Sequence, residues 1–122
     1  MAAPIYAKLS NLEAEGKIEG KSGYASVLYA KYNETKGQRS LFDATHALWY
    51  RDTRFPGMHT PDAKPIFWSR GNGWVFAAHA RLLDILPATD PHYLEYLSTF
   101  KAMANTLVGL QVQAGYWNEN LV

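Results

Sequence analysis

Apolar residues recur along most of this chain at intervals of three and four positions, the spacing that places side chains on one face of an α-helix. This pattern predicts four helices, over residues 4–15, 24–36, 72–86 and 91–114. The third carries apolar side chains on nearly every side, so we expect it to occupy an inner, well-buried position. His79 lies on this helix, and we expect it to be a hydrogen-bonded histidine of the core.

Residues that favour turns or helix starts separate these helices. Asp90 can cap the fourth helix, and Pro91 fits its first turn, where the missing N–H of proline costs nothing. We expect Gly115 to end that helix. Three glycines separate the first helix from the second: Gly16, Gly20 and Gly23.

A long connection joins the second helix to the third, over residues 37–70. Connections of this length without helices are uncommon in compact domains and are often functional. This one is rich first in aromatic residues and then in residues that favour turns. We therefore expect a loop or a short hairpin that lines a site.

Composition and charge narrow the classes of function. Hydrophobic residues make up 48% of the chain and aromatic residues 14%, enough apolar surface to offset the entropy of ordering it. Twelve Lys and Arg against eleven Asp and Glu leave a net charge of +1 without a basic cluster, which argues against a nucleic-acid partner. The absence of cysteine excludes disulfides and thiolate metal sites, and the four histidines lack metal-site spacing, so we expect no metal.

The N-terminal residues do not resemble a signal peptide, because no long apolar run follows a basic region. No stretch approaches the roughly 18 apolar residues that a membrane span requires, so we expect no membrane partner. If Met1 is the natural start, the protein is expected to be cytoplasmic; otherwise the sequence leaves the compartment open.

The segment from Phe67 to Trp74 carries the most informative chemistry. Two tryptophans flank an arginine and an asparagine across two glycines, at the point where the apolar third helix begins. Arg70 can bind a carboxylate through two hydrogen bonds, and indole rings can stack on a sugar. A helix start adds unpaired N–H groups and positive potential, so these parts suit a sugar acid. The alternative is a glycine-rich helix start with buried tryptophan anchors and a structural arginine.

The segment Trp68-Ser69-Arg70-Gly71-Asn72-Gly73-Trp74 resembles glycoside hydrolase family 105, the unsaturated rhamnogalacturonyl hydrolases, and more distantly the neighbouring family 88. The resemblance extends to residues 41–43 and 48–52 before this segment, and to residues 115–118 after it. It implies an all-α fold, in which helical hairpins form part of an (α/α)6 barrel. Residues 1–122 would then be a single partial domain, roughly a third of that barrel.

The resemblance also implies an activity, the hydrolysis of the bond between a 4,5-unsaturated uronic acid and the next sugar, usually rhamnose in pectin fragments. In this family an aspartic acid protonates the enol-ether double bond, water adds and the hemiketal opens, with no metal or redox cofactor. The partner is then an unsaturated uronic-acid oligosaccharide. The residues expected to form its site are Trp68, Arg70, Asn72 and Trp74. Arg70 pairs with the carboxylate, Trp74 stacks on the sugar or shapes the pocket, and Asn72 fixes the loop by hydrogen bonding.

The same resemblance places the acid aspartate a few residues before Met1, so we expect this chain to be inactive by itself. Asp52 is the candidate replacement acid within the chain, beside Arg51, and a structural contact between an arginine and Asp52 is the alternative. Asp62 is a second candidate, in a turn sequence where aspartate is common. Some relatives have a His-Gly pair where this chain has Arg51-Asp52, so we expect a different substrate preference.

Two other functions fit parts of the sequence. The chain could be a non-enzymatic helical module that binds proteins, although such a module has no need of the aromatic-arginine-glycine segment. It could belong to a sugar epimerase, which shares the barrel but relies on paired histidines that this sequence does not show. Helices of a partial barrel leave apolar faces exposed, so we also predict self-association through those faces.

Overall fold

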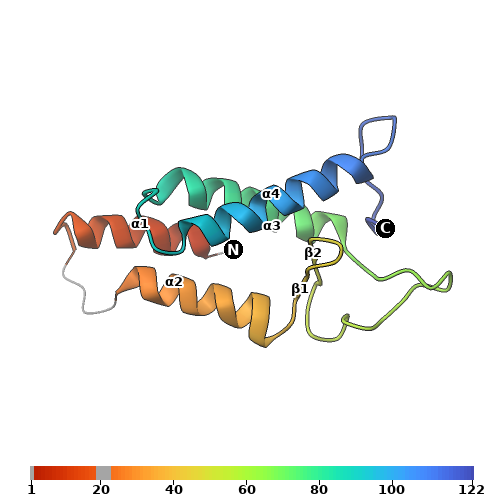
Figure 1. Ribbon diagram of the computed structural model, residues 1–122, viewed down its shortest axis with the longest axis horizontal. Coiled ribbons are helices and arrows are strands. Elements are labelled where there is room, and N and C mark those ends of the chain that lie inside the picture. The colour runs from red at the N-terminus through yellow and green to blue at the C-terminus, as the bar shows by residue number, and fades with distance from the viewer. Residues whose placement is uncertain (1, 19–22) are drawn as a thin grey trace.

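The computed structural model describes residues 2–18 and 23–122. Helices dominate this part of the chain, and two very short strands lie between the second and third of them (Figure 1). The elements in chain order are α1 (Ala3–Ala14), α2 (Tyr24–Asn33), the π-helical turn η1 (Glu34–Gln38), β1 (Phe42–Asp43), β2 (Leu48–Trp49), α3 (Ser69–Ile85) and α4 (Tyr93–Leu110). No helix in the described ranges is long and apolar enough to cross a membrane.

The described helices form two antiparallel hairpins, α1 with α2 and α3 with α4 (Figure 1). The hairpins meet where α1 packs against α3, and these two helices run in the same direction. A side-chain hydrogen bond fixes this contact, because the Asn11 amide donates to the carbonyl of Ile85 at 2.9 Å. The predicted helical hairpins are therefore present, and α3 contacts α1, α4 and β2. The expectation that α3 is well buried is wrong for this chain, because only Asn72, His79 and Leu82 of this helix are buried and Trp74 is 54% exposed.

One apolar cluster joins all four α-helices. Its buried members are Ala7, Leu28, Leu82, Leu86 and Tyr96. Burial of a large apolar side chain stabilises a fold by about 1.5–3 kcal/mol, so this cluster supplies much of the energy that holds the hairpins together. Leu82 and Leu86 lie at the C-terminal end of α3, whereas β2 meets α3 at Asn72, near its start.

The second helix ends differently from the prediction of 24–36, because regular α-helix stops at Asn33 and a π-helical turn follows. The Thr35 hydroxyl donates to the Lys31 carbonyl at 2.8 Å and so competes with the regular helical bond to that carbonyl. In this turn the Lys36 ammonium donates to Glu95 at 3.1 Å and to the Thr99 hydroxyl at 3.0 Å. The π-helical turn thus ties α2 to α4.

The last helix is shorter than the predicted 91–114. It begins at Tyr93, and Asp90 does not cap it; the Asp90 carboxylate instead accepts the backbone N–H of His92 at 2.8 Å and shapes the preceding turn. It ends at Leu110, before Gly115, which lies in a separate turn with φ +85°. Among the three glycines predicted to part the first two helices, Gly20 lies outside the described residues.

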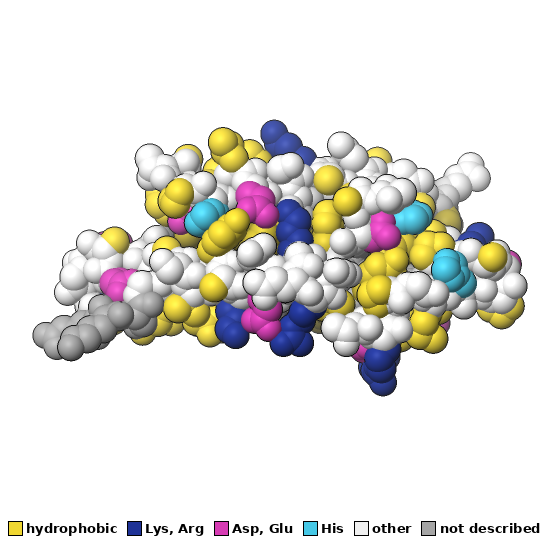
Figure 2. Space-filling view, turned by 60° about the horizontal axis from the view of Figure 1, so that its bottom comes forward, with side chains coloured by type: hydrophobic (Ala, Val, Ile, Leu, Met, Phe, Trp, Pro, Cys, Tyr) yellow, Lys and Arg dark blue, Asp and Glu magenta, His cyan; other side chains and the backbone are white. Residues whose placement is uncertain are grey.

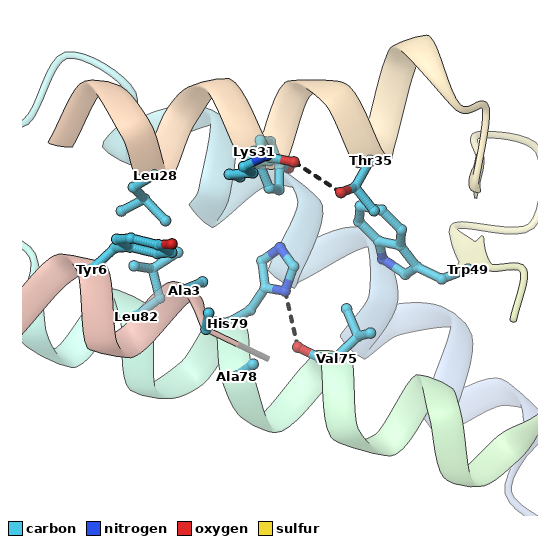
Figure 3. A pocket seen from close by; sticks show the side chains of 12 residues that line it. Ala3, Tyr6, Leu28, Lys31, Thr35, Trp49, Val75, Ala78, His79 and Leu82 are labelled. Carbon is cyan, nitrogen blue, oxygen red and sulfur yellow. Dashed lines mark hydrogen bonds between the residues drawn. The ribbon is translucent and has the colours of Figure 1, made fainter. Parts of the chain in front are cut away.

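His79 is buried in the core, as predicted, and only 6% of it is exposed. Its Nδ1 bonds to the carbonyl of Val75 at 2.9 Å, and Figure 3 shows the imidazole pointing from α3 toward α2. The Nε2 atom faces a largely apolar cavity of about 290 Å³ and has no hydrogen-bond partner among the described residues. Burial therefore lowers the pKa of His79 below its ordinary value of 6.5.

This burial predicts a pH-dependent stability. Below about pH 6.5 the unfolded chain binds a proton that folded His79 does not, so stability should fall as the pH drops through that value. We expect a lower urea midpoint at about pH 5.5 than at about pH 8, with a smaller difference in a His79→Phe variant. His59→Asn, a change at an exposed histidine, is the matched control. A His79→Phe protein that keeps the full dependence would contradict the prediction.

Candidate substrate-binding site

The start of α3 is held in place by Asn72, whose surface is only 1% exposed. Its side-chain oxygen accepts the backbone N–H of Trp49 at 2.8 Å, and its amide donates to the Trp49 carbonyl at 3.0 Å. The same amide also donates to the Trp68 carbonyl at 3.1 Å. Asn72 therefore joins β2 to the first turn of α3 by hydrogen bonding. Its burial keeps it from direct contact with a ligand.

Helix α3 begins at Ser69, three residues before the predicted start at Asn72. The backbone N–H of Asn72 already bonds to the Trp68 carbonyl at 3.1 Å as part of the first helical turn. Arg70 and Trp74 are consequently four residues apart on one helix, which places them on the same side of it. The segment is thus a helix start, as predicted, and Ser69, Arg70 and Gly71 belong to the helix as well.

Residues 119–121, near the C-terminus, hydrogen-bond to residues 67–69 at the start of α3. The Asn120 side chain accepts the backbone N–H of Phe67 at 2.7 Å, and the Phe67 carbonyl accepts the N–H of Leu121 at 3.0 Å. The backbone N–H of Ser69 donates to the Glu119 carbonyl at 2.9 Å. Leu48, Phe67 and Leu121 form a second buried cluster beneath this contact. Trp68 is therefore held between two segments that are distant in sequence.

A cavity of about 420 Å³ opens beside Trp68, and it combines aromatic, apolar and charged side chains. The guanidinium carbon of Arg70 lies 5.2 Å from the centre of the Trp68 ring, and that of Arg51 lies 5.8 Å from the same centre. At these distances a cation is attracted to the face of an indole. The residues that line the cavity are Arg51, Phe55, Ile66, Trp68, Arg70, Glu119 and Asn120.

The donors of Arg70 are available to a ligand. Within residues 2–18 and 23–122 the Arg70 guanidinium makes no ion pair and donates no hydrogen bond, and the residue is exposed. A free guanidinium can bind a carboxylate through two parallel hydrogen bonds. The half-buried indole of Trp68 beside it offers an apolar edge or face to a sugar ring. The arrangement is therefore suited to binding a sugar acid.

The predicted site residues fall into three places. Trp68 and Arg70 line the cavity together, whereas Asn72 is buried behind them. Trp74 does not line this cavity; it lies one turn further along α3 and is 54% exposed. The prediction missed Glu119 as a lining residue, because only the pairing of the C-terminal segment with residues 65–69 brings it there.

Asp52, the candidate replacement acid, makes a structural contact with Arg54. Its carboxylate accepts two hydrogen bonds from the Arg54 guanidinium, both 2.9 Å long, and a third from the Arg54 backbone N–H at 3.0 Å. These bonds lower the pKa of Asp52 to about 2. The group is therefore ionised near neutral pH, where a general acid must carry a proton.

Asp62, the second candidate, is likewise held in an ionised form. It accepts a hydrogen bond from the Thr60 hydroxyl at 2.6 Å, and this bond lowers the pKa of Asp62. Asp62 is exposed and does not line the cavity. No cluster of three His, Asp or Glu side chains in the described part of the chain could hold a metal ion.

Substitutions at Gly71 and Gly73 test whether the Trp68 indole packs closely against the first turn of α3. A Cβ at Gly71 would lie 3.0 Å from Cε3 of Trp68, whereas a Cβ at Gly73 would meet nothing within 4 Å. Gly71→Ala should therefore move the indole, and Gly73→Ala should leave it in place while stabilising the helix by about 0.5–1 kcal/mol. The measurement is the indole N–H resonance of Trp68, assigned with Trp68→Phe. An unmoved resonance in Gly71→Ala would show that the close contact is absent.

Comparison with known proteins gives the family of this chain. The family model for Glycosyl Hydrolase Family 88 matches residues 1–122. The unsaturated 3S-rhamnoglycuronyl hydrolase of Formosa agariphila is 38% identical over 128 aligned residues, which cover 100% of this chain and 32% of that protein. The chain thus spans about a third of the length of this relative.

Solved structures share the fold. A family 88 glycosyl hydrolase from Bacteroides vulgatus has a TM-score of 0.86 at 32% identity, over 98% of this chain and 33% of its own. A protein named as a polysaccharide lyase has a TM-score of 0.85 at 30% identity, over 98% of this chain and 32% of its own. The predicted hairpins of an (α/α)6-barrel glycosidase and the predicted resemblance are both confirmed. The chain belongs to glycosyl hydrolase family 88.

Proposed function

We propose that this chain carries the uronate-binding part of a hydrolase that removes 4,5-unsaturated uronic acid from pectin-derived rhamnogalacturonan oligosaccharides. The observation that carries the proposal is the unpaired Arg70 guanidinium beside Trp68, in an open cavity at the start of α3. Family membership supports the reaction class, and the relative from Formosa agariphila is itself named as an unsaturated rhamnoglycuronyl hydrolase.

Each residue of the segment has a distinct role in this proposal. Arg70 binds the uronate carboxylate. The Trp68 indole attracts the Arg70 guanidinium and also contacts the sugar ring. The positive potential at the start of α3 adds to the attraction of the carboxylate. Asn72 positions Trp68 from within the protein. Trp74, exposed one turn along α3, shapes the outer edge of the bound sugar.

We further propose that the chain by itself binds this sugar without cleaving it. Hydrolysis requires a proton donor for the enol-ether double bond, and Asp52 is ionised through its contact with Arg54. Glu119 is the acidic residue that lines the cavity, but its side chain is exposed to solvent. The proposed role is therefore recognition of the uronate. In this proposal neither Asp52 nor Glu119 supplies the proton for hydrolysis.

Binding of an unsaturated rhamnogalacturonan disaccharide tests the role of Arg70. A charge-assisted hydrogen bond contributes about 1.5–3 kcal/mol, so Arg70→Gln should weaken binding by roughly 10- to 100-fold in a calorimetric or NMR titration. Arg39→Gln is the matched control, because Arg39 is an exposed arginine paired with Glu34 away from the cavity. Equal affinity of the wild-type and Arg70→Gln proteins for the disaccharide would contradict the proposal.

The ultraviolet absorbance of the same disaccharide tests the proposed inactivity, since hydrolysis destroys the conjugated double bond. We expect a flat trace from folded protein. A fall that disappears in Asp52→Asn or in Glu119→Gln would show that the chain contains a working acid. Circular dichroism of each variant establishes that it is folded.

We also propose that the chain self-associates through exposed apolar side chains of its helices. Leu94 and Val108 on α4 are 75% and 74% exposed, and Ile5 on α1 is 63% exposed. Figure 2 shows hydrophobic side chains interspersed with charged and polar ones over one face of the molecule. Exposed apolar surface of this kind favours association, because contact removes it from water.

Light scattering at micromolar concentration measures this association. The wild-type chain should give a mass above that of the 13.7 kDa monomer. A Leu94→Glu, Val108→Glu double variant should shift the distribution toward the monomer, because charge at these positions opposes apolar contact. Gln38→Glu combined with Gln113→Glu, at two exposed positions outside α1 and α4, is the control for the added charge. A sharp wild-type monomer would contradict the proposal.

A further inference from the structure

The cavity of about 290 Å³ lies between α1, α2 and α3, and in the described part of the chain it shares no lining residue with the cavity beside Trp68 (Figure 3). Its walls combine aliphatic side chains with the aromatic rings of Tyr32 and Trp49. Lys31 and Thr35 line it and are exposed, so the cavity opens to solvent beside them. In another protein an apolar cavity of about 150 Å³ binds benzene, so this one has room for a six-membered ring.

The buried imidazole of His79 directs an unpaired nitrogen into this cavity. Its Nδ1 lies 2.9 Å from the carbonyl of Val75, which can only accept a hydrogen bond, so Nδ1 carries the proton of the neutral ring. Burial lowers the pKa of His79, so the ring is neutral at about pH 8 and its Nε2 is an acceptor. Nε2 has no hydrogen-bond partner among the residues that the structure describes, and His79 is only 6% exposed. The cavity therefore offers a free acceptor to a ligand that brings a donor.

The polar atoms of the two aromatic wall residues are already bonded to α4. The Tyr32 hydroxyl shares a hydrogen bond of 2.7 Å with the Thr99 hydroxyl, and Nε1 of Trp49 donates to the sulfur of Met103 at 3.3 Å. The surface that these two rings give to the cavity is therefore mainly carbon. Aromatic walls of this kind favour a flat ring, in stacked or edge-to-face contact.

We propose that this cavity binds a small phenol, whose hydroxyl donates to Nε2 of His79 while its ring packs against Tyr32 and Trp49. Water can also donate to Nε2, but it leaves the apolar walls hydrated. A phenol makes the same hydrogen bond and removes those walls from contact with water. A phenolic hydroxyl loses its proton only at about pH 10, so it remains a donor where His79 is neutral. The site is independent of the proposed uronate site.

NMR titrations with phenol and toluene test this assignment, because toluene has a methyl group where phenol has its donor. At about pH 8 phenol should shift the methyl resonances of Leu82, which lines the cavity, in a saturable manner. The His79→Phe variant keeps an aromatic ring but lacks the acceptor. In this variant the ratio of the affinity for phenol to that for toluene should be about tenfold lower than in the wild-type chain, the effect of one lost hydrogen bond.

Two adjacent alanines of α3 provide a matched pair of variants. Ala78 lines the cavity, so Ala78→Leu should prevent binding because its added atoms occupy the space. Ala77 is exposed and outside the cavity, so Ala77→Leu should leave binding unchanged. Circular dichroism of each variant establishes that it is folded.

Three results would each overturn the assignment. The first is the absence of a saturable shift in the wild-type chain at up to about 10 mM phenol. The second is an unchanged ratio of the two affinities in folded His79→Phe. The third is phenol binding that survives in folded Ala78→Leu, which would place the ligand elsewhere on the chain.

Discussion

The hydrogen bonds of the Asn72 side chain are the constraint on which the candidate site depends. One buried amide joins both backbone groups of Trp49, on the short hairpin, to the carbonyl of Trp68 at the start of α3. Without these bonds the polar backbone of two segments would be buried without partners, at a cost of about 1–3 kcal/mol for each group. Together with the pairing of Trp68 and Asn120, these bonds set the position of Trp68 between the two arginines of the cavity.

The packing of the helices determines where the hydrogen bonds of Asn72 can form. Packing of α1 against α3, with the Asn11 contact to Ile85, orients α3 so that its first turn reaches β2. The ties from Tyr32 and Lys36 to Thr99 then fix α2 against α4. The apolar cluster therefore supplies the stability, and the polar contacts supply the alignment. The site lies at one end of this framework, where the backbone departs from regular helix (Figure 1).

Local patterns predicted the helices well, because helical spacing of apolar residues reports directly on burial. They placed the start of α3 too late, since glycines at positions 71 and 73 indicate a break unless a side chain such as Asn72 stabilises the turn. Trp68 and Arg70 were predicted as site residues because their chemistry suits a sugar acid and because their segment resembles a known hydrolase family. Arg51 and Glu119 were not, because their approach to Trp68 depends on contacts between distant segments. Asn72 holds Trp49, two residues before Arg51, and the pairing of Trp68 with Asn120 brings Glu119 to the cavity. The pairing of Asp52 with Arg54 rather than Arg51 also depends on loop geometry that no periodicity reveals.

The central claim is that the uronate binds between Arg70 and Trp68. The most direct measurement is an NMR titration of isotope-labelled chain with the unsaturated uronyl disaccharide, which follows all four indole N–H resonances. The account predicts the largest shift at Trp68, together with intermolecular contacts from its ring to the uronic acid. A saturable shift centred instead on Trp117, which is exposed near the C-terminus, would contradict the account.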